Sequence, residues 1–70
     1  MNTDQLKSFI QVAENLNFAR AAESLKITQS AVSRQIHSLE DELGAKLLHR
    51  TTRTVTLTPA GVSFLEDAKN

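Results

Sequence analysis

The spacing of the apolar residues over the first 43 positions constrains this chain most strongly. In the first stretch they recur at steps of three and four residues: Leu6, Phe9, Ile10, Ala13 and Leu16. This spacing is the stripe of an amphipathic helix that lays one face on a core. It predicts a helix from about Thr3 to Leu16, with Asn2 as its N-cap and Gln5 as the return partner of a capping box.

Two further stretches follow the same spacing. The apolar residues of the second are Phe18, Ala21, Ala22 and Leu25, and those of the third are Val32, Ile36, Leu39 and Leu43. They predict a helix over 18–25 with Asn17 as its cap, and a helix over 29–43 with Thr28 as its cap. Gly44 is expected to end the third helix in a left-handed conformation.

The period changes after position 44. Residues 48–50 and 55–57 are typical of short strands, and 51–53 is expected at the tip of the hairpin that joins them, although no Asn-Gly or Asp-Gly marks the turn. Pro59 then begins a fourth helix. The apolar residues of that helix are Val62, Phe64, Leu65 and Ala68. The remaining core is too small to cover all four, so they predict a dimerisation surface. The apolar face still continues where the sequence ends at Asn70, so we expect that the chain once extended further.

Length and composition allow one small domain of 70 residues. The absence of cysteine excludes a disulfide and a thiolate metal site, and fits a reducing compartment. No apolar run exceeds two residues, and the first four residues, Met1 to Asp4, lack the layout of a signal peptide. We therefore expect a soluble, cytoplasmic domain with no membrane partner.

The polar face of the third predicted helix points to a function. A turn of three residues, 26–28, separates this helix from the second, which is the length expected of a helix-turn-helix whose second helix enters the DNA major groove. One stripe of that helix carries residues able to contact bases or phosphates: Gln29, Ser30, Ser33, Arg34 and His37. A solvated helix face has the same composition, so the stripe alone leaves both interpretations open. The acidic run 40–42 is expected to be solvated and to point away from DNA.

The predicted hairpin is basic. Lys46, Arg50 and Arg53 carry its three charges, and no acid lies between positions 45 and 58. This composition suits a wing over about 46–58, because Arg enters narrow minor grooves and clamps phosphates. Thr51, Thr52 and Thr54 are expected to add hydroxyl contacts to phosphate. The alternative is a solubilising loop.

Other chemistry has little support in the sequence. His37 and His49 have no partner at metal-ligand spacing, and Ser33 with His37 lacks the acid and oxyanion loop of a triad. Gly44 and Gly61 stand alone, so no phosphate loop is present. We expect no enzyme activity, no metal and no cofactor, and the three Phe residues are expected in the core.

Five segments taken in order resemble the N-terminal DNA-binding domain of LysR-type transcriptional regulators: 18–25, 29–36, 39–44, 47–50 and 57–61. The resemblance covers nearly the whole chain without gaps. It implies a mainly α fold with a small two-stranded wing, a winged helix-turn-helix over 1–58, and the start of a linker and dimerisation helix over 59–70. It also implies a bacterial regulator whose small-molecule effector binds a separate C-terminal domain.

The resemblance also assigns site residues by position. The family's base and phosphate contacts correspond to Gln29, Ser33, Arg34, Arg50 and Arg53. Two positions depart from the common pattern. Ser30 stands where the family frequently has Pro, and the serine adds a hydrogen-bond donor near the groove. Leu48 stands where the family frequently has Phe, and the smaller side chain is expected to affect the packing of the wing.

The zero formal net charge argues at first against a polyanionic partner. Divided along the chain, however, the charge is −2 over 1–45, +3 over 46–58 and −1 over 59–70. Such a distribution is expected to orient the domain on a polyanion as well as attract it. So few cations per subunit predict that two subunits bind together as a homodimer or larger oligomer. The alternative from another class is a winged-helix module that binds protein, which the neutral charge and the apolar fourth helix also fit.

Overall fold

Side-chain caps set the helix starts in the computed structural model, which describes residues 2–69. Asn2 Oδ1 accepts a hydrogen bond from Gln5 N at 2.8 Å and Gln5 Oε1 accepts one from Asn2 N at 3.1 Å, which confirms the capping box. The other two predicted caps are also confirmed, because Asn17 accepts from the backbone of Arg20 and Thr28 from that of Ala31. The elements over 2–69 are α1 (Thr3–Asn15), α2 (Phe18–Leu25), α3 (Gln29–Leu43), β1 (Leu48–Arg50), β2 (Val55–Leu57) and α4 (Pro59–Lys69).

Left-handed residues end the first three helices. Gly44 follows α3 with φ +67°, as predicted, and Lys26 follows α2 with φ +59°. Leu16 takes the same conformation after α1 and leaves 46% of its surface exposed, so its predicted place in the core stripe is wrong. Leu43, the last residue of α3, is also exposed, so its predicted place in the core stripe is wrong as well.

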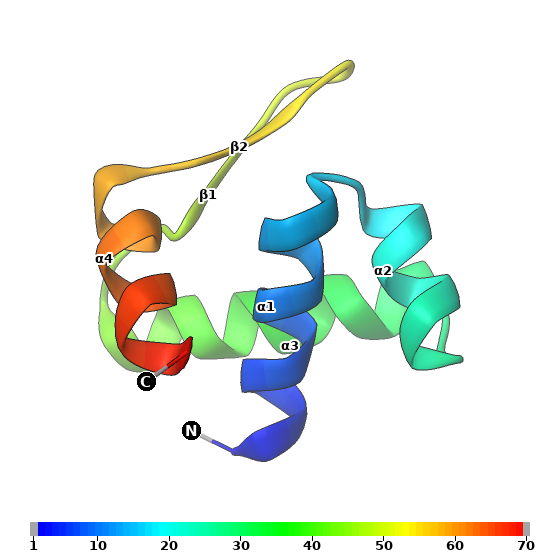
Figure 1. Ribbon diagram of the computed structural model, residues 1–70, viewed down its shortest axis with the longest axis horizontal. Coiled ribbons are helices and arrows are strands. Elements are labelled where there is room, and N and C mark those ends of the chain that lie inside the picture. Colours follow the sequence, from blue (N-terminus) through cyan, green and yellow to red (C-terminus); the bar gives the residue numbers. More distant parts are fainter. Residues whose placement is uncertain (1, 70) are drawn as a thin grey trace.

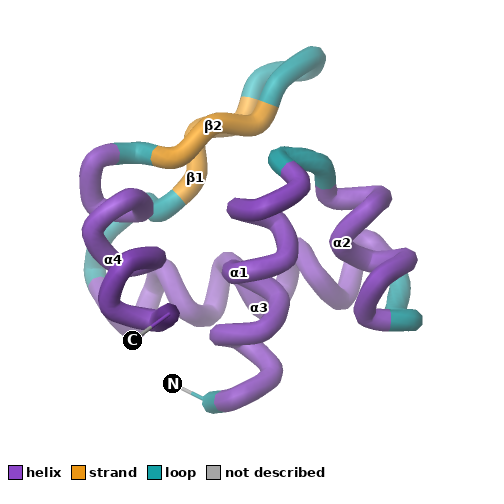
Figure 2. Tube along the Cα trace, in the orientation of Figure 1, coloured by secondary structure: helices purple, strands orange, loops and turns teal. Residues whose placement is uncertain are grey.

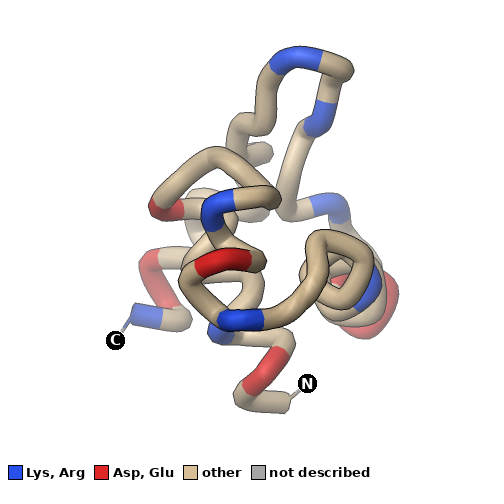
Figure 3. The backbone as a smooth tube through the Cα atoms, turned by 90° about the vertical axis from the view of Figure 1, so that its right-hand side faces the viewer, with Lys and Arg blue, Asp and Glu red and all other residues tan. Residues whose placement is uncertain are grey.

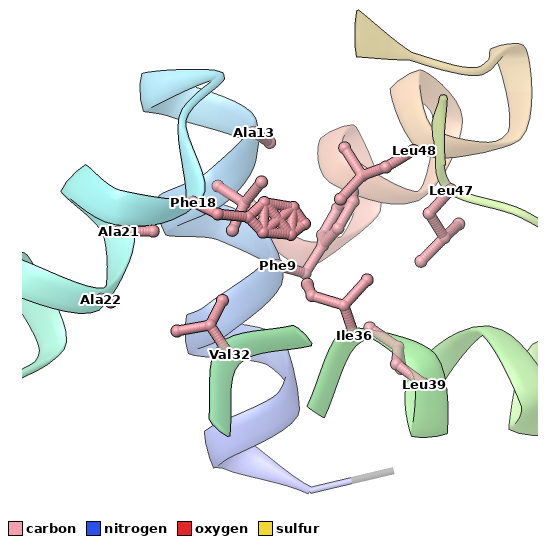
Figure 4. Close-up of a cluster of buried hydrophobic side chains, with 11 residues drawn as sticks. Phe9, Ala13, Phe18, Ala21, Ala22, Val32, Ile36, Leu39, Leu47 and Leu48 are labelled. Carbon is pink, nitrogen blue, oxygen red and sulfur yellow. The ribbon is translucent and has the colours of Figure 1, made fainter. Parts of the chain in front are cut away.

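The core lies between α1 and the elements around it. In Figure 1, α1 stands at the centre, α3 crosses behind it, and α2 and α4 flank it on opposite sides. Figure 4 shows the side chains that fill the centre, with the rings of Phe9 and Phe18 among them. The buried apolar residues are Phe9, Val12, Ala13, Phe18, Ala21, Ala22, Val32, Ile36, Leu39, Leu47 and Leu48.

The hairpin projects from the helices as an antiparallel pair (Figure 2), with Leu48 opposite Leu57. Thr51 closes its tip, because Thr51 N donates to Thr54 O at 2.9 Å while Thr51 Oγ1 accepts from Thr54 N at 2.9 Å. A side-chain hydroxyl thus supplies the turn bond that the sequence left without an obvious turn residue. The predicted strand ranges are confirmed.

Helix α4 is fixed to the body at its first turn. Thr58 Oγ1 donates to Lys46 O at 2.6 Å and accepts from Gly61 N at 3.0 Å. Gly61 lies so close to the preceding segment that a Cβ on it would stand 2.0 Å from the carbonyl oxygen of Leu47. The backbone of α4 therefore packs directly on the segment that enters the hairpin.

The apolar face predicted for dimerisation is divided between core and solvent. The Phe64 ring packs edge to face on the Phe9 ring, with the two ring centres 5.5 Å apart, and Leu65 also packs on the core. Ala68 is half-buried, and Val62 leaves 45% of its surface exposed. Self-association through this face stays a prediction. The division into domains 1–58 and 59–70 also stays a prediction. Residue 1, where the first would begin, and residue 70, where the second would end, lie outside the described residues.

Candidate nucleic-acid interface

The outer face of α3 carries the predicted polar stripe. Its inner face is buried through Val32, Ile36 and Leu39, and this burial turns the opposite side of the helix to solvent. Along that outer face Gln29, Ser30, Arg34 and His37 are exposed and Ser33 is half-buried. The structure brings the stripe together on one face, and its part in DNA binding stays a prediction.

The hairpin lies beside this face. Gln29 at the start of α3 lines one shallow hollow together with Arg53 and its neighbours at the tip of the hairpin. Further along α3, His37 lines a second hollow with Lys46 and Arg50. Both ends of the stripe therefore adjoin the hairpin. Figure 3 shows Lys and Arg positions along the hairpin and no acidic position there, whereas the acidic positions lie on the helices.

Arg50 of the hairpin is held against the helices. Its guanidinium carbon lies 3.9 Å from the centre of the Phe18 ring, over the face of that ring. Its Nη1 donates to Ser33 Oγ at 3.5 Å. This residue from β1 is thus joined to both α2 and α3. The stacking on Phe18 was not predicted, because Phe18 and Arg50 are 32 positions apart and no local pattern relates them.

The threonines and the other cations of the hairpin lie in different settings. The hydroxyls of Thr51 and Thr54 are 2.9 Å apart and build the turn, which gives them a structural role besides the predicted contact with phosphate. Thr52 and Arg53 are exposed at the tip. Lys46 is at the opposite end of the hairpin, with its Nζ 3.9 Å from Glu40 Oε1. An acid thus partly offsets the charge of the predicted phosphate contact at position 46.

Glu40 contradicts the prediction of a solvated acidic run. It is only 7% exposed, and its Oε2 accepts hydrogen bonds from Leu47 N at 2.8 Å and Leu48 N at 3.3 Å. A sequence signal was available, because Glu40 follows Ile36 by four positions and so shares its buried face. Asp41 and Glu42 are exposed, as predicted. Glu40 thus connects α3 to Leu47 and Leu48, where the chain enters the hairpin.

Two other kinds of site find no support within residues 2–69. In this range no three His, Cys, Asp or Glu residues come together in a way that suits a metal ion. None of the helices described there has the length and apolarity needed to cross a membrane.

Over residues 3–62 the sequence matches the family described as bacterial regulatory helix-turn-helix proteins, lysR family. It is 51% identical over 69 residues to the HTH-type transcriptional regulator TfdS of Cupriavidus pinatubonensis, across 99% of this chain and 23% of that protein. It is 52% identical over 64 residues to the uncharacterized HTH-type transcriptional regulator YnfL of Escherichia coli, across 91% of this chain and 22% of that protein. The chain thus spans less than a quarter of the length of these relatives, which are named as regulators and not as enzymes.

Solved structures match the fold closely. The DNA-binding domain of CbnR, crystallised in complex with DNA, superposes with a TM-score of 0.95 at 49% identity, covering 99% of this chain and 79% of that one. The corresponding domain of BenM, crystallised with catB site 1 DNA, gives a TM-score of 0.94 at 43% identity, covering 99% of this chain and 78% of that one. Together with the four helices and the two-stranded sheet found within residues 2–69, these similarities confirm the winged helix-turn-helix prediction.

Proposed function

Because the chain belongs to the LysR family of bacterial helix-turn-helix regulators, we propose that it binds specific sequences of double-stranded DNA and thereby regulates transcription. The observation that carries the proposal is that the basic hairpin lies beside the polar stripe of α3, with Gln29 and His37 lining hollows together with hairpin residues and Ser33 bonded to Arg50. Proteins as similar as the CbnR and BenM domains were crystallised with DNA, which supports it.

The first half of α3 would read bases in the major groove. Gln29 suits adenine, whose N6 and N7 pair with an amide, and Arg34 suits the O6 and N7 of guanine. Ser30, Ser33 and His37 lie on the same face and would contact base edges or phosphates. The exposed Asp41 and Glu42 at the far end of α3 would repel phosphates, so that end is expected to turn away from DNA.

The hairpin would lie on the adjacent minor groove and its phosphates. Arg53 at the exposed tip can enter a narrow minor groove, where the negative potential is strongest. Thr51, Thr52 and Lys46 are candidates for weaker phosphate contacts. With three cations on the hairpin, one subunit makes few phosphate contacts, and non-specific affinity depends on their number.

Useful affinity would therefore come from a homodimer formed through α4, with Val62 as the most exposed apolar residue of its face. Two recognition helices related by a dyad read half-sites about 34 Å apart, which is roughly one turn of DNA. A bacterial chromosome lies in the cytoplasm, so the proposal implies a cytoplasmic protein. We further propose that this domain binds DNA without a cofactor and that a small-molecule effector acts through another part of a longer chain.

Fluorescence anisotropy on a duplex selected from a random pool tests the proposal. Arg34→Ala is expected to reduce discrimination between the selected and a scrambled duplex, because it removes a base contact. Arg53→Ala is expected to weaken binding to both duplexes and to flatten the salt dependence. Lys69→Ala is the control, because it removes one cation from the far end of α4. Unchanged affinity and salt slope in both arginine variants would refute the proposal.

A further inference from the structure

We infer that Phe18 is a positioning residue for DNA binding, which holds the Arg50 guanidinium beside Ser33 so that hairpin and recognition helix bind one DNA phosphate together. The inference rests on the function proposed above. It concerns a phenylalanine of the core that has no reason of its own to contact DNA.

The Phe18 ring is a fixed platform. It is 7% exposed and lies among the core side chains, as Figure 4 shows. Arg50, by contrast, is exposed, and its guanidinium carbon lies 3.9 Å from the centre of the ring. A cation over the face of an aromatic ring is attracted by the ring quadrupole, and Arg makes this contact more often than Lys. The long Arg50 side chain is therefore held before any ligand arrives.

A second contact sets the direction of the guanidinium. Arg50 Nη1 donates to Ser33 Oγ at 3.5 Å, and Ser33 belongs to the face of α3 that carries the polar stripe. A guanidinium has five N–H donors, so this bond leaves others to pair with phosphate oxygens. The Ser33 hydroxyl accepts from Arg50 and retains its own proton, which it can donate to the same phosphate.

The other two cations of the hairpin lack this arrangement. Lys46 has an acidic partner, since its Nζ is 3.9 Å from Glu40 Oε1. Arg53 is at the tip, where its backbone N donates to Thr51 Oγ1 at 3.3 Å and its side chain is exposed. Ordering a long side chain at an interface weakens binding by about two- to tenfold, and the stack on Phe18 removes that cost for Arg50 in advance.

Nuclear magnetic resonance of the free protein tests the stack without DNA. Protons over an aromatic ring are shielded, so the Arg50 δ protons and Nε–H proton are expected upfield of those of Arg53. The upfield shift should disappear in F18L, which keeps an apolar side chain and removes the ring. Arg50 signals at ordinary positions in the wild-type protein would overturn the inference, whether or not F18L folds.

A double-mutant cycle on a selected duplex tests the effect on binding. F18L is expected to weaken binding about two- to tenfold and R50A about tenfold or more, because R50A also removes the charged hydrogen bonds. F18L combined with R50A should bind as R50A does. F9L is the matched control, because it removes a buried ring that packs on Phe64, whereas the guanidinium of Arg50 lies over Phe18.

The outcomes separate the inference from the proposed function. If F18L weakens binding by the same factor in the wild-type and R50A backgrounds, as a general structural defect would, the inference is wrong. If R50A binds like the wild type, the inference is wrong while the proposed function stands. If the wild-type protein binds no duplex with salt-dependent affinity, the proposed function and the inference are both wrong, even where the upfield shift shows the stack.

Discussion

Replacing Glu40 by alanine should cost this domain a large part of its stability. The substitution removes the one oxygen that accepts from both Leu47 N and Leu48 N. Because Leu47 and Leu48 are 1% and 6% exposed, water cannot readily replace that acceptor. An unsatisfied buried donor costs about 1–3 kcal/mol. The 2.8 Å bond to Leu47 belongs at the upper part of that range and the 3.3 Å bond to Leu48 at the lower, so we expect a loss of about 3 kcal/mol.

Two further variants separate the acceptor from the charge. Glu40→Gln keeps an oxygen that can serve both N–H groups, since the structure directs both bonds to one oxygen. It loses the charge and the attraction of Lys46, whose side chain is 72% exposed and therefore well screened by water. We expect it to cost about 1 kcal/mol. Asp41→Ala changes the exposed acid next to it and should stay within about 0.5 kcal/mol of the wild type.

Urea unfolding followed by circular dichroism measures these differences. A domain of this size has a total stability of about 4–10 kcal/mol and a slope near 1 kcal/mol per M of urea, so Glu40→Ala should lower the midpoint by about 3 M. A midpoint within 0.5 M of the wild type, roughly half a kcal/mol, would refute the role given to Glu40. Equal losses for the alanine and glutamine variants would show that the charge matters and the acceptor does not.

Three other substitutions have effects that the structure sets. Gly61→Ala should cost about 2 kcal/mol in a thermal melt, because its Cβ would stand 2.0 Å from Leu47 O; a gain, as helix propensity alone predicts, would contradict this. Gly44→Ala should cost only about 1 kcal/mol, since φ is +67° but nothing lies within 4 Å, and a larger loss would reveal an unseen contact. Val62→Asp should abolish self-association in sedimentation equilibrium without lowering the melting temperature, and an unchanged association constant would exclude this face.

Local signals account for the parts of the fold that were predicted correctly. The caps Asn2, Asn17 and Thr28 act on residues three positions away, so the sequence alone identifies where their helices begin. Gly44 similarly ends α3 through its own backbone conformation. The stripe of α3 was also predictable, because a helix with one buried face necessarily turns the opposite face outward.

Contacts between distant segments account for what was missed. The carboxylate of Glu40 is buried because the chain returns at Leu47, and the composition of an acidic run does not contain that return. Arg50 belongs to strand β1, whereas Phe18, on which it stacks, belongs to helix α2, so no local pattern relates the two residues. Gly61 lies in segment 57–61 of the resemblance, but nothing local explains why glycine is needed there. Its importance follows from the approach of the Leu47 carbonyl oxygen, which only the packing of α4 produces.

Amide chemical-shift mapping with a duplex selected from a random pool shows whether the stripe of α3 and the hairpin bind DNA, because it locates the bound surface residue by residue. If the stripe and the hairpin bind DNA, the largest shift changes are expected over 29–37 and 50–54, with little change over 66–69 and a steep loss of binding as salt is raised. Shifts that ignore the duplex at low salt and follow protein concentration along α4 would contradict this expectation, and would identify the domain as a protein-binding module instead.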